Sequence, residues 1–226
     1  MDTLSDPFTR IFTYAALVSG ATIALNPLAG SKADLDATVK HIRPTVIVAS
    51  TATLNSLLAG TTRAGIWREL IHYFRCRTLE SGRIPKGNTS RLRMVFSAEA
   101  AGGPDPHPLS SEDLNDLRVL LEAKVVYGLK HHMVAGPITQ QNAYDYRVQK
   151  QVPKPDKVNG LDKKSAHFGG VAPSCEVFTR DWMEYKASDE GGSRGRIVVR
   201  GSTAMGEEVD LGVTGKWQPE GVLSYA

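Results

Sequence analysis

The residues best suited to chemistry lie in one short stretch, 125–132, with the sequence VVYGLKHH. Two β-branched residues lead into Tyr127 and Gly128, and the basic residues Lys130 and His131 follow. This pattern is typical of a short buried strand that ends in a turn. In open α/β sheets ligands bind at that end of the strands. The stretch therefore indicates either a binding site or a plain junction between strand and loop.

Histidines in this stretch raise the question of a metal site, since His131 and His132 adjoin each other and His107 lies upstream. Adjacent side chains in a strand point to opposite faces, and no acidic or cysteine partner lies at a useful spacing. We therefore expect no metal ligands. We also expect no nucleophilic serine, because Ser97 lacks the Gly-x-Ser-x-Gly pattern of a nucleophile elbow.

The composition is that of an ordinary globular protein. Of 226 residues, 41% are hydrophobic and 23% charged, and the net charge of +3 gives no reason to expect a nucleic-acid partner. The two cysteines, Cys76 and Cys175, lie far apart, which suits a reducing, intracellular compartment. No apolar run is long enough to span a bilayer. The basic and aromatic stretch 61–78 leaves peripheral membrane association open, and nothing in the sequence fixes an oligomeric state.

Elements upstream of this stretch alternate between helix and strand. Ser5 or Asp6 is expected to cap the first helix and Ser110 or Ser111 the last. A loop of small residues is expected at 98–104, after the third strand. The expected segments are a helix at 7–17, a strand at 21–25, a helix from 31, a strand at 45–49, a helix at 51–58, a strand at 91–97, a helix at 109–123 and a strand at 124–129. This order predicts an α/β fold with a mainly parallel sheet and flanking helices.

The texture of the sequence changes after residue 135. Residues 136–165 are polar and rich in lysine and proline, which is typical of a loop or linker. Short β-like segments at 175–179, 195–200 and 221–225 follow, separated by glycines. We therefore expect an α/β lobe at 1–135, a linker at 136–165 and a smaller β-rich subdomain at 166–226.

Several segments, taken in order, resemble one family. The segment HIRPTVIV (41–48) resembles the motif KPTVFV, and LRMVFSAEAAGG (92–103) resembles LRLIVSGGAPL. YGL (127–129) matches the start of YGLTE, GGVAPSCEV (169–177) resembles GSVGKPLPGVEV, and GRIVVRG (195–201) resembles GEIVVRG. These are motifs of the adenylate-forming, AMP-binding acyl-CoA synthetases, and the resemblance is greatest to the long-chain fatty acyl-CoA synthetases.

The resemblance implies a protein related to ligases that make an acyl-adenylate from ATP and a carboxylate and then a thioester with coenzyme A. ATP or AMP and coenzyme A are its implied cofactors, and a fatty acyl group its implied ligand. Tyr127 would stack on or pack near the adenine, and Gly128 would border the acyl site. The full implied cofactor-binding set is Ser97, Ala98, Glu99, Gly102, Tyr127, Gly128, Leu129, Lys130 and Asp210.

Departures from the family pattern affect the charged groups. The threonine and glutamate of YGLTE, which bind phosphate and magnesium, are here Lys130 and His131. Imidazole is a poor ligand for magnesium, although a lysine ammonium can still contact phosphate. The family's TGD motif aligns in two ways: residues 214–216 keep its threonine and glycine, and Asp210 keeps its acid.

Two catalytic parts of the family have no counterpart between residues 1 and 226. These are the phosphate loop, whose place lies before the first residue, and the C-terminal domain with the catalytic lysine. We therefore predict no catalytic residue and no adenylate formation by this chain alone. Two interpretations follow: a piece or shortened relative of a long-chain acyl-CoA ligase, or a non-catalytic member that binds a nucleotide, an acyl group or a protein.

Overall fold

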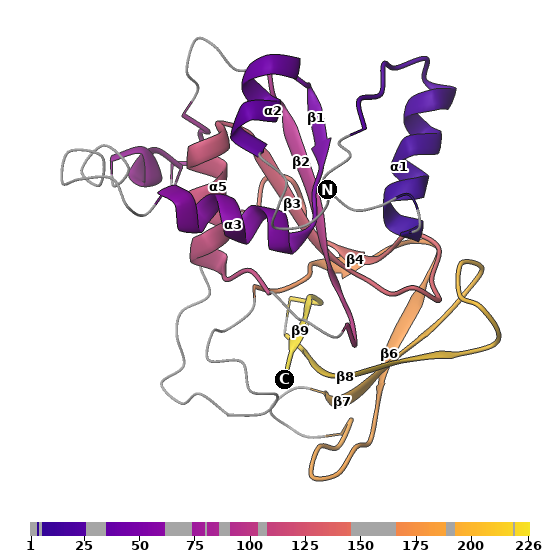
Figure 1. The fold of residues 1–226 in the computed structure, drawn as a ribbon. Helices are drawn as coiled ribbons and strands as arrows, with labels where there is room; N and C mark the ends of the chain where they lie inside the picture. The colour runs from indigo at the N-terminus through magenta and orange to yellow at the C-terminus, as the bar shows by residue number, and fades with distance from the viewer. Residues whose placement is uncertain are drawn as a thin grey trace.

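The computed structural model describes residue 4 and residues 6–25, 35–61, 74–79, 81–85, 91–103, 108–145, 166–188, 193–218 and 220–226. The elements within these ranges are α1 (Pro7–Val18), α2 (Leu35–Ile42), β1 (Val46–Val48), α3 (Thr51–Thr61), β2 (Met94–Ala100), α5 (Ser111–Leu121), β3 (Lys124–Lys130), β4 (Pro137–Gln140), β5 (Gly170–Val171), β6 (Glu176–Arg180), β7 (Arg194–Arg200), β8 (Val209–Trp217) and β9 (Leu223–Tyr225). Figure 1 shows a helix-covered sheet in one half and a second sheet in the other.

The first sheet has the strand order β1-β2-β3-β4-β5. Strands β1, β2 and β3 are parallel, with Ile47 opposite Val95 and Phe96 opposite Val126. The predicted parallel pairing of these three segments is thus confirmed. Their β-branched residues suit strands that are covered on both faces. Strands β4 and β5 continue the same sheet in antiparallel fashion.

Helices cover both faces of this sheet: α2, α3 and α5 lie on one side and α1 on the other (Figure 1). Asp6 caps α1, whose Phe12 ring packs on Phe96 of β2 at a centroid distance of 4.5 Å. Ser110 caps α5 through a reciprocal capping box with Asp113. These caps resolve two positions for which the sequence allowed two residues each.

The second sheet has the order β6-β7-β8-β9 and is antiparallel throughout. A single cluster of buried side chains reaches from the helices on the first sheet to the inner face of the second. The ring of Phe168 lies between Tyr127 of β3, at 5.5 Å, and Tyr225 of β9, at 4.8 Å. The expected fold class, a parallel-rich α/β sheet followed by a smaller β-rich unit, is confirmed. No helix in the described part of the chain has the length and apolar character that a membrane span requires.

Some local expectations differ from the structure. Residues 21–25 form no strand, and Leu25 is 64% exposed, because no neighbouring strand pairs with them. Residues 98–100 belong to β2 rather than to a loop, since β3 continues to pair with them as far as Lys130. The first sheet also extends past residue 135 through β4 and β5. Residues 146–165, the rest of the expected linker, lie outside the described residues.

Candidate functional site

The carboxyl ends of β2 and β3 meet the second sheet at β8. The amide of Ala101 donates to the carbonyl of Lys130 over 2.9 Å, which joins the two strand ends. Gly102 follows with φ +67°, and a Cβ added there would lie 2.9 Å from the carbonyl oxygen of Leu211. The turn therefore needs glycine both for its conformation and for its close approach to β8. This contact brings Gly102, Lys130 and Asp210, three predicted site residues, to one region.

Lys130 forms an ion pair with a residue far away in sequence. Its Nζ lies 2.9 Å from Oδ2 of Asp6, the N-cap of α1, and both side chains are largely buried. The same carboxylate oxygen accepts hydrogen bonds from the amide and the hydroxyl of Thr9. The Lys130 ammonium also lies 5.6 Å from the ring centroid of Phe8. The Asp6 carboxylate thus binds the Lys130 ammonium, which the sequence alone allows to contact a phosphate.

The His131 ring accepts a hydrogen bond from the backbone. The amide of Met133 donates to its Nδ1 over 3.3 Å, so the neutral ring carries its proton on Nε2. Burial lowers the pKa of His131, the neighbouring His132 lowers it further, and the more distant Asp210 opposes both effects. At neutral pH this imidazole is therefore uncharged. Its remaining ring nitrogen is a donor and not a metal ligand.

Asp210 lies on the outer face of the second sheet. Its Oδ1 accepts from Nε of Arg196 over 2.6 Å and from the amide of Gly212 over 2.9 Å. Partial burial raises the pKa of Asp210, but the hydrogen bonds from Arg196 and Gly212 outweigh this effect and place the pKa below its usual value. The carboxylate is ionised at neutral pH and is already paired with a guanidinium.

These side chains do not fit a magnesium ion. Magnesium requires hard oxygen ligands in near-octahedral geometry. The region where β2 and β3 meet β8 offers instead the Lys130 ammonium, a donor nitrogen of His131 and the Arg196-paired carboxylate of Asp210. Within the described ranges, no group of three or more histidine, cysteine, aspartate or glutamate residues is placed to hold a metal. His107, the third histidine of the sequence argument, lies outside those ranges.

The predicted cofactor-binding residues are mostly inside the protein. Of the nine, only Gly102 and Asp210 are exposed, and Ser97, Ala98, Glu99, Gly128, Leu129 and Lys130 are all buried. Tyr127 has no exposed surface, and its hydroxyl accepts the amide of Leu109 over 3.3 Å. Burial and the charge of Glu99 raise the pKa of Tyr127 well above its usual value. Seven of the nine are therefore inside the protein, with Tyr127 and Leu129 in its core cluster.

Gly128 has a packing role. A Cβ at this position would lie 2.3 Å from the carbonyl oxygen of Thr139 on the neighbouring strand β4. The glycine is therefore required for β4 to pair closely with β3. Its contribution to any ligand site is indirect.

A groove of about 730 Å³ opens beside the edge of the first sheet, and none of its lining residues is in the predicted cofactor-binding set. Its apolar lining includes Ile11, Val171 and Val222, and its polar lining includes the amide side chains of Gln140 and Asn142. These residues come from α1, β4, β5 and the segment before β9. Residues 169–174 of the motif-like segment 169–177 contribute to the lining, but no local pattern links that segment to Ile11 or Gln140, so the groove could not be predicted from it.

A polar network lies behind two lining residues of this groove, Gln141 and Asp145. Asp145 lies 3.3 Å from Nε2 of His167, and the His167 carbonyl accepts Nε2 of Gln141 over 2.6 Å. Arg118 of α5, 1% exposed, donates to Oε1 of Gln141 and to the carbonyl of Val125. Gln141 and Asp145 line the groove, so the contacts from Arg118 and His167 hold these two side chains in place.

The fold is that of the N-terminal domain of the adenylate-forming acyl- and aryl-CoA ligases, as comparison with solved structures shows. The N-terminal domain of FACL13 from Mycobacterium tuberculosis matches all of this chain with a TM-score of 0.62 and 12% identity. The o-succinylbenzoate CoA synthetase of Bacillus subtilis, bound to a product analogue, matches all of it with a TM-score of 0.61 and 16% identity. A benzoate CoA ligase from Burkholderia xenovorans matches 93% of it with a TM-score of 0.59 and 17% identity.

The chain spans about half or less of the proteins that it matches: 49%, 39% and 37% of their respective lengths. No family model and no curated protein sequence matches it. The similarity is therefore one of fold.

Proposed function

We propose that this chain is a non-catalytic relative of the acyl- and aryl-CoA ligases that holds an acyl or aryl group without activating it. The observation that carries the proposal is the ion pair between Lys130 and Asp6. It occupies the end of β3, where the resemblance implies contacts to phosphate and magnesium. The long-chain motifs of the sequence favour a fatty acyl group as the ligand.

Adenylate formation depends on positioned charge. Phosphoryl-type reactions are accelerated almost entirely by positioning and by cations that neutralise developing negative charge. Here one cation is neutralised by Asp6, and the neighbouring His131 is uncharged at neutral pH. Because neither side chain can then neutralise the negative charge that develops on the phosphate, we expect no measurable turnover.

The groove supports the binding half of the proposal. Ligand sites are concave, mainly apolar and supplied with a few polar groups that orient the ligand. Ile11, Val171 and Val222 supply apolar surface, and Gln140 and Asn142 supply amide groups that bond to a carboxylate or a thioester carbonyl.

Titration calorimetry with decanoate, benzoate, AMP and ATP, with and without magnesium, tests the proposal. We expect heat from a carboxylate and no magnesium-dependent binding of ATP. The variant Ala135→Trp, which fills the groove at an exposed lining residue, should weaken carboxylate binding at least about tenfold. Ala21→Trp, an equally exposed alanine outside the groove, is the matched control.

An ATP–pyrophosphate exchange assay with the same carboxylates tests the absence of catalysis. Exchange above background would contradict the proposal directly. Carboxylate binding that survives Ala135→Trp unchanged would contradict the assignment of the groove.

A further inference from the structure

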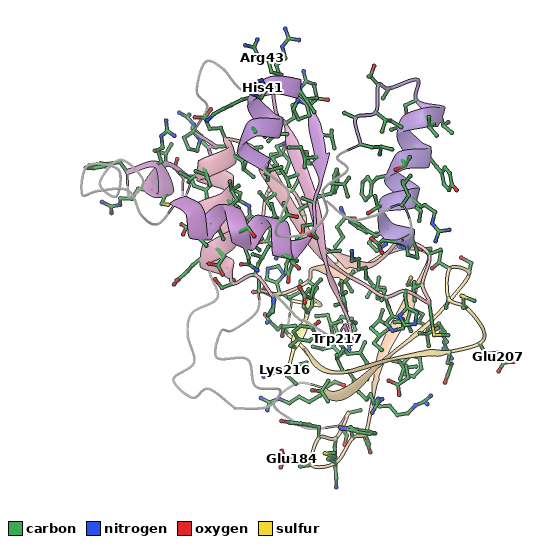
Figure 2. All side chains as sticks on the ribbon, in the orientation of Figure 1. His41, Arg43, Glu184, Glu207, Lys216 and Trp217 are labelled. Carbon is green, nitrogen blue, oxygen red and sulfur yellow. The ribbon has the colours of Figure 1, made fainter. Side chains whose placement is uncertain are left out.

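Basic side chains gather at the amino ends of β1 and β2, at the end of the first sheet opposite to the candidate site. This basic edge consists of Lys40, His41, Arg43, Arg91 and Arg93, all of them exposed. The backbone holds them together: the amide of Arg93 donates to the carbonyl of Thr45 over 2.8 Å, and Arg43 lies two residues before Thr45. Figure 2 shows His41 and Arg43 at the opposite end of the molecule from Glu184.

The arginines of the basic edge differ from those of the second sheet. On the outer face of that sheet Arg180 pairs with Glu208, Arg196 with Asp210 and Arg200 with Glu176. Among the described residues Arg43, Arg91 and Arg93 have no ion-pair partner. Glu122, an acidic residue near the same edge, is engaged by Arg75. These three arginines of the second sheet are therefore neutralised internally, and the basic edge leaves three like charges to solvent.

Arg43 has a backbone conformation that is energetically unfavourable for any residue with a side chain. Its φ of 50° lies in the left-handed region, where a residue with a Cβ is disfavoured and glycine is the usual choice. A chain that needed only to end α2 at this position would be more stable with glycine. An arginine at this position therefore carries a backbone cost that glycine would not, which points to a use for its side chain.

Exposed apolar side chains at the basic edge favour a membrane over a nucleic acid as the partner. Ile42 is 53% exposed and Val46 is 49% exposed, so aliphatic side chains stand among the cations. Single-stranded nucleic acid would instead need aromatic platforms. Tyr144, an exposed ring beside the start of β3, has the Lys124 ammonium over its face at 3.8 Å. Cations mixed with exposed aliphatic groups match the headgroup region of an anionic membrane.

We infer that the basic edge is a docking surface for an anionic lipid bilayer. The arginines attract the negative leaflet, and Ile42 and Val46 enter the headgroup region. Docked in this way, the protein keeps the carboxyl ends of its parallel strands facing away from the lipid. This attachment is electrostatic, so it weakens as salt is added.

Vesicle co-sedimentation of the full chain tests the inference, with phosphatidylcholine vesicles that contain or lack phosphatidylserine. We expect salt-sensitive binding only to the vesicles with phosphatidylserine. Each arginine near an anionic surface contributes about a fivefold increase in partitioning, so the triple variant Arg43→Gly, Arg91→Gln, Arg93→Gln should lose roughly a hundredfold.

Two single variants separate docking from folding and from net charge. Arg43→Gly should bind about fivefold less well while its thermal midpoint stays equal or rises, because glycine relaxes the left-handed backbone. Arg200→Gln changes the net charge by the same amount on the second sheet and should bind as the parent does. Equal binding to both kinds of vesicle, no binding to either, or unchanged binding by the triple variant would overturn the inference. So would tighter binding to polyuridylate RNA than to the phosphatidylserine vesicles.

Discussion

Gly128 decides whether β4 can lie against β3. A Cβ added there would meet the Thr139 carbonyl at 2.3 Å, a distance that backbone atoms can relieve only by moving the strand. We predict that Gly128→Ala lowers the free energy of unfolding by about 2–3 kcal/mol. Gly170→Ala is the control, because nothing lies within 4 Å of its added Cβ. Urea denaturation measures both, and equal midpoints for the two variants would refute the packing role.

His131 makes stability depend on pH. Its pKa is lowered in the folded state by burial first and by His132 second, so the unfolded chain binds a proton more readily. Its contribution to stability is therefore complete above the ordinary histidine pKa and is lost as the pH falls through that value and below. We predict that acidification from neutral pH lowers the urea midpoint less in His131→Asn than in the parent. Asn can still accept the Met133 amide, and parallel pH curves for the two proteins would count against this account.

At the residue scale, the sequence predicted which side chains would be neighbours better than it predicted their roles. The position of Lys130 at the end of a strand follows from the pattern of apolar and basic residues. Its partner Asp6 lies 124 positions away, and no local pattern indicates such a pair. The same applies to Tyr127, whose aromatic type is compatible with stacking on a ligand and with the core that it occupies.

At the scale of single elements, α5 depends on the residue that caps its N-terminus. Ser110 accepts the amide of Asp113 over 3.0 Å, and Asp113 accepts the amide of Ser110 over the same distance. We predict that Ser110→Ala costs about 1 kcal/mol of stability. The amide of Asp113 loses its acceptor, and the Asp113 carboxylate that accepts the amide of residue 110 loses the hydrogen bond from the Ser110 hydroxyl. Ser111→Ala, one position later, should be nearly neutral. Thermal unfolding followed by circular dichroism checks the pair, and an equal loss in both would exclude the cap.

Elements with strong local patterns were predicted, and elements defined by distant partners were not. The three parallel strands are runs of apolar residues, and α5 combines a cap with regularly spaced leucines. The longest strand, β8, was missed because Gly212 and Gly215 interrupt its alternation. It exists because β7 and β9 pair with its two edges. Strand β4 was missed for the same reason, since a proline and polar residues hide its fit against β3.

At the scale of the whole molecule, the two sheets share one core, and this determines how the chain should unfold. Phe168 has no exposed surface and lies between Tyr127 of the first sheet and Tyr225 of the second. Its amide also donates to the carbonyl of Leu223 at the start of β9, so both backbone and ring connect the sheets. Neither sheet can therefore lose its packing at this point without exposing the other.

We predict that Phe168→Ala lowers the free energy of unfolding by about 3–5 kcal/mol and that both sheets still unfold in one transition. Phe178→Ala is the matched control: that ring is half-buried on the outer face of the second sheet, beside Arg180 and Arg200, and its loss should cost about 1 kcal/mol. Urea unfolding followed by tryptophan fluorescence and by far-ultraviolet circular dichroism measures both variants. Trp182 and Trp217, which contribute to the fluorescence, lie in the part of the chain that forms the second sheet. The helices, which give the circular dichroism signal, pack on the first sheet. Separate midpoints for the two signals in the parent protein would mean that the sheets unfold independently, and an equal cost for the two phenylalanines would mean that the Phe168 ring is not what joins them.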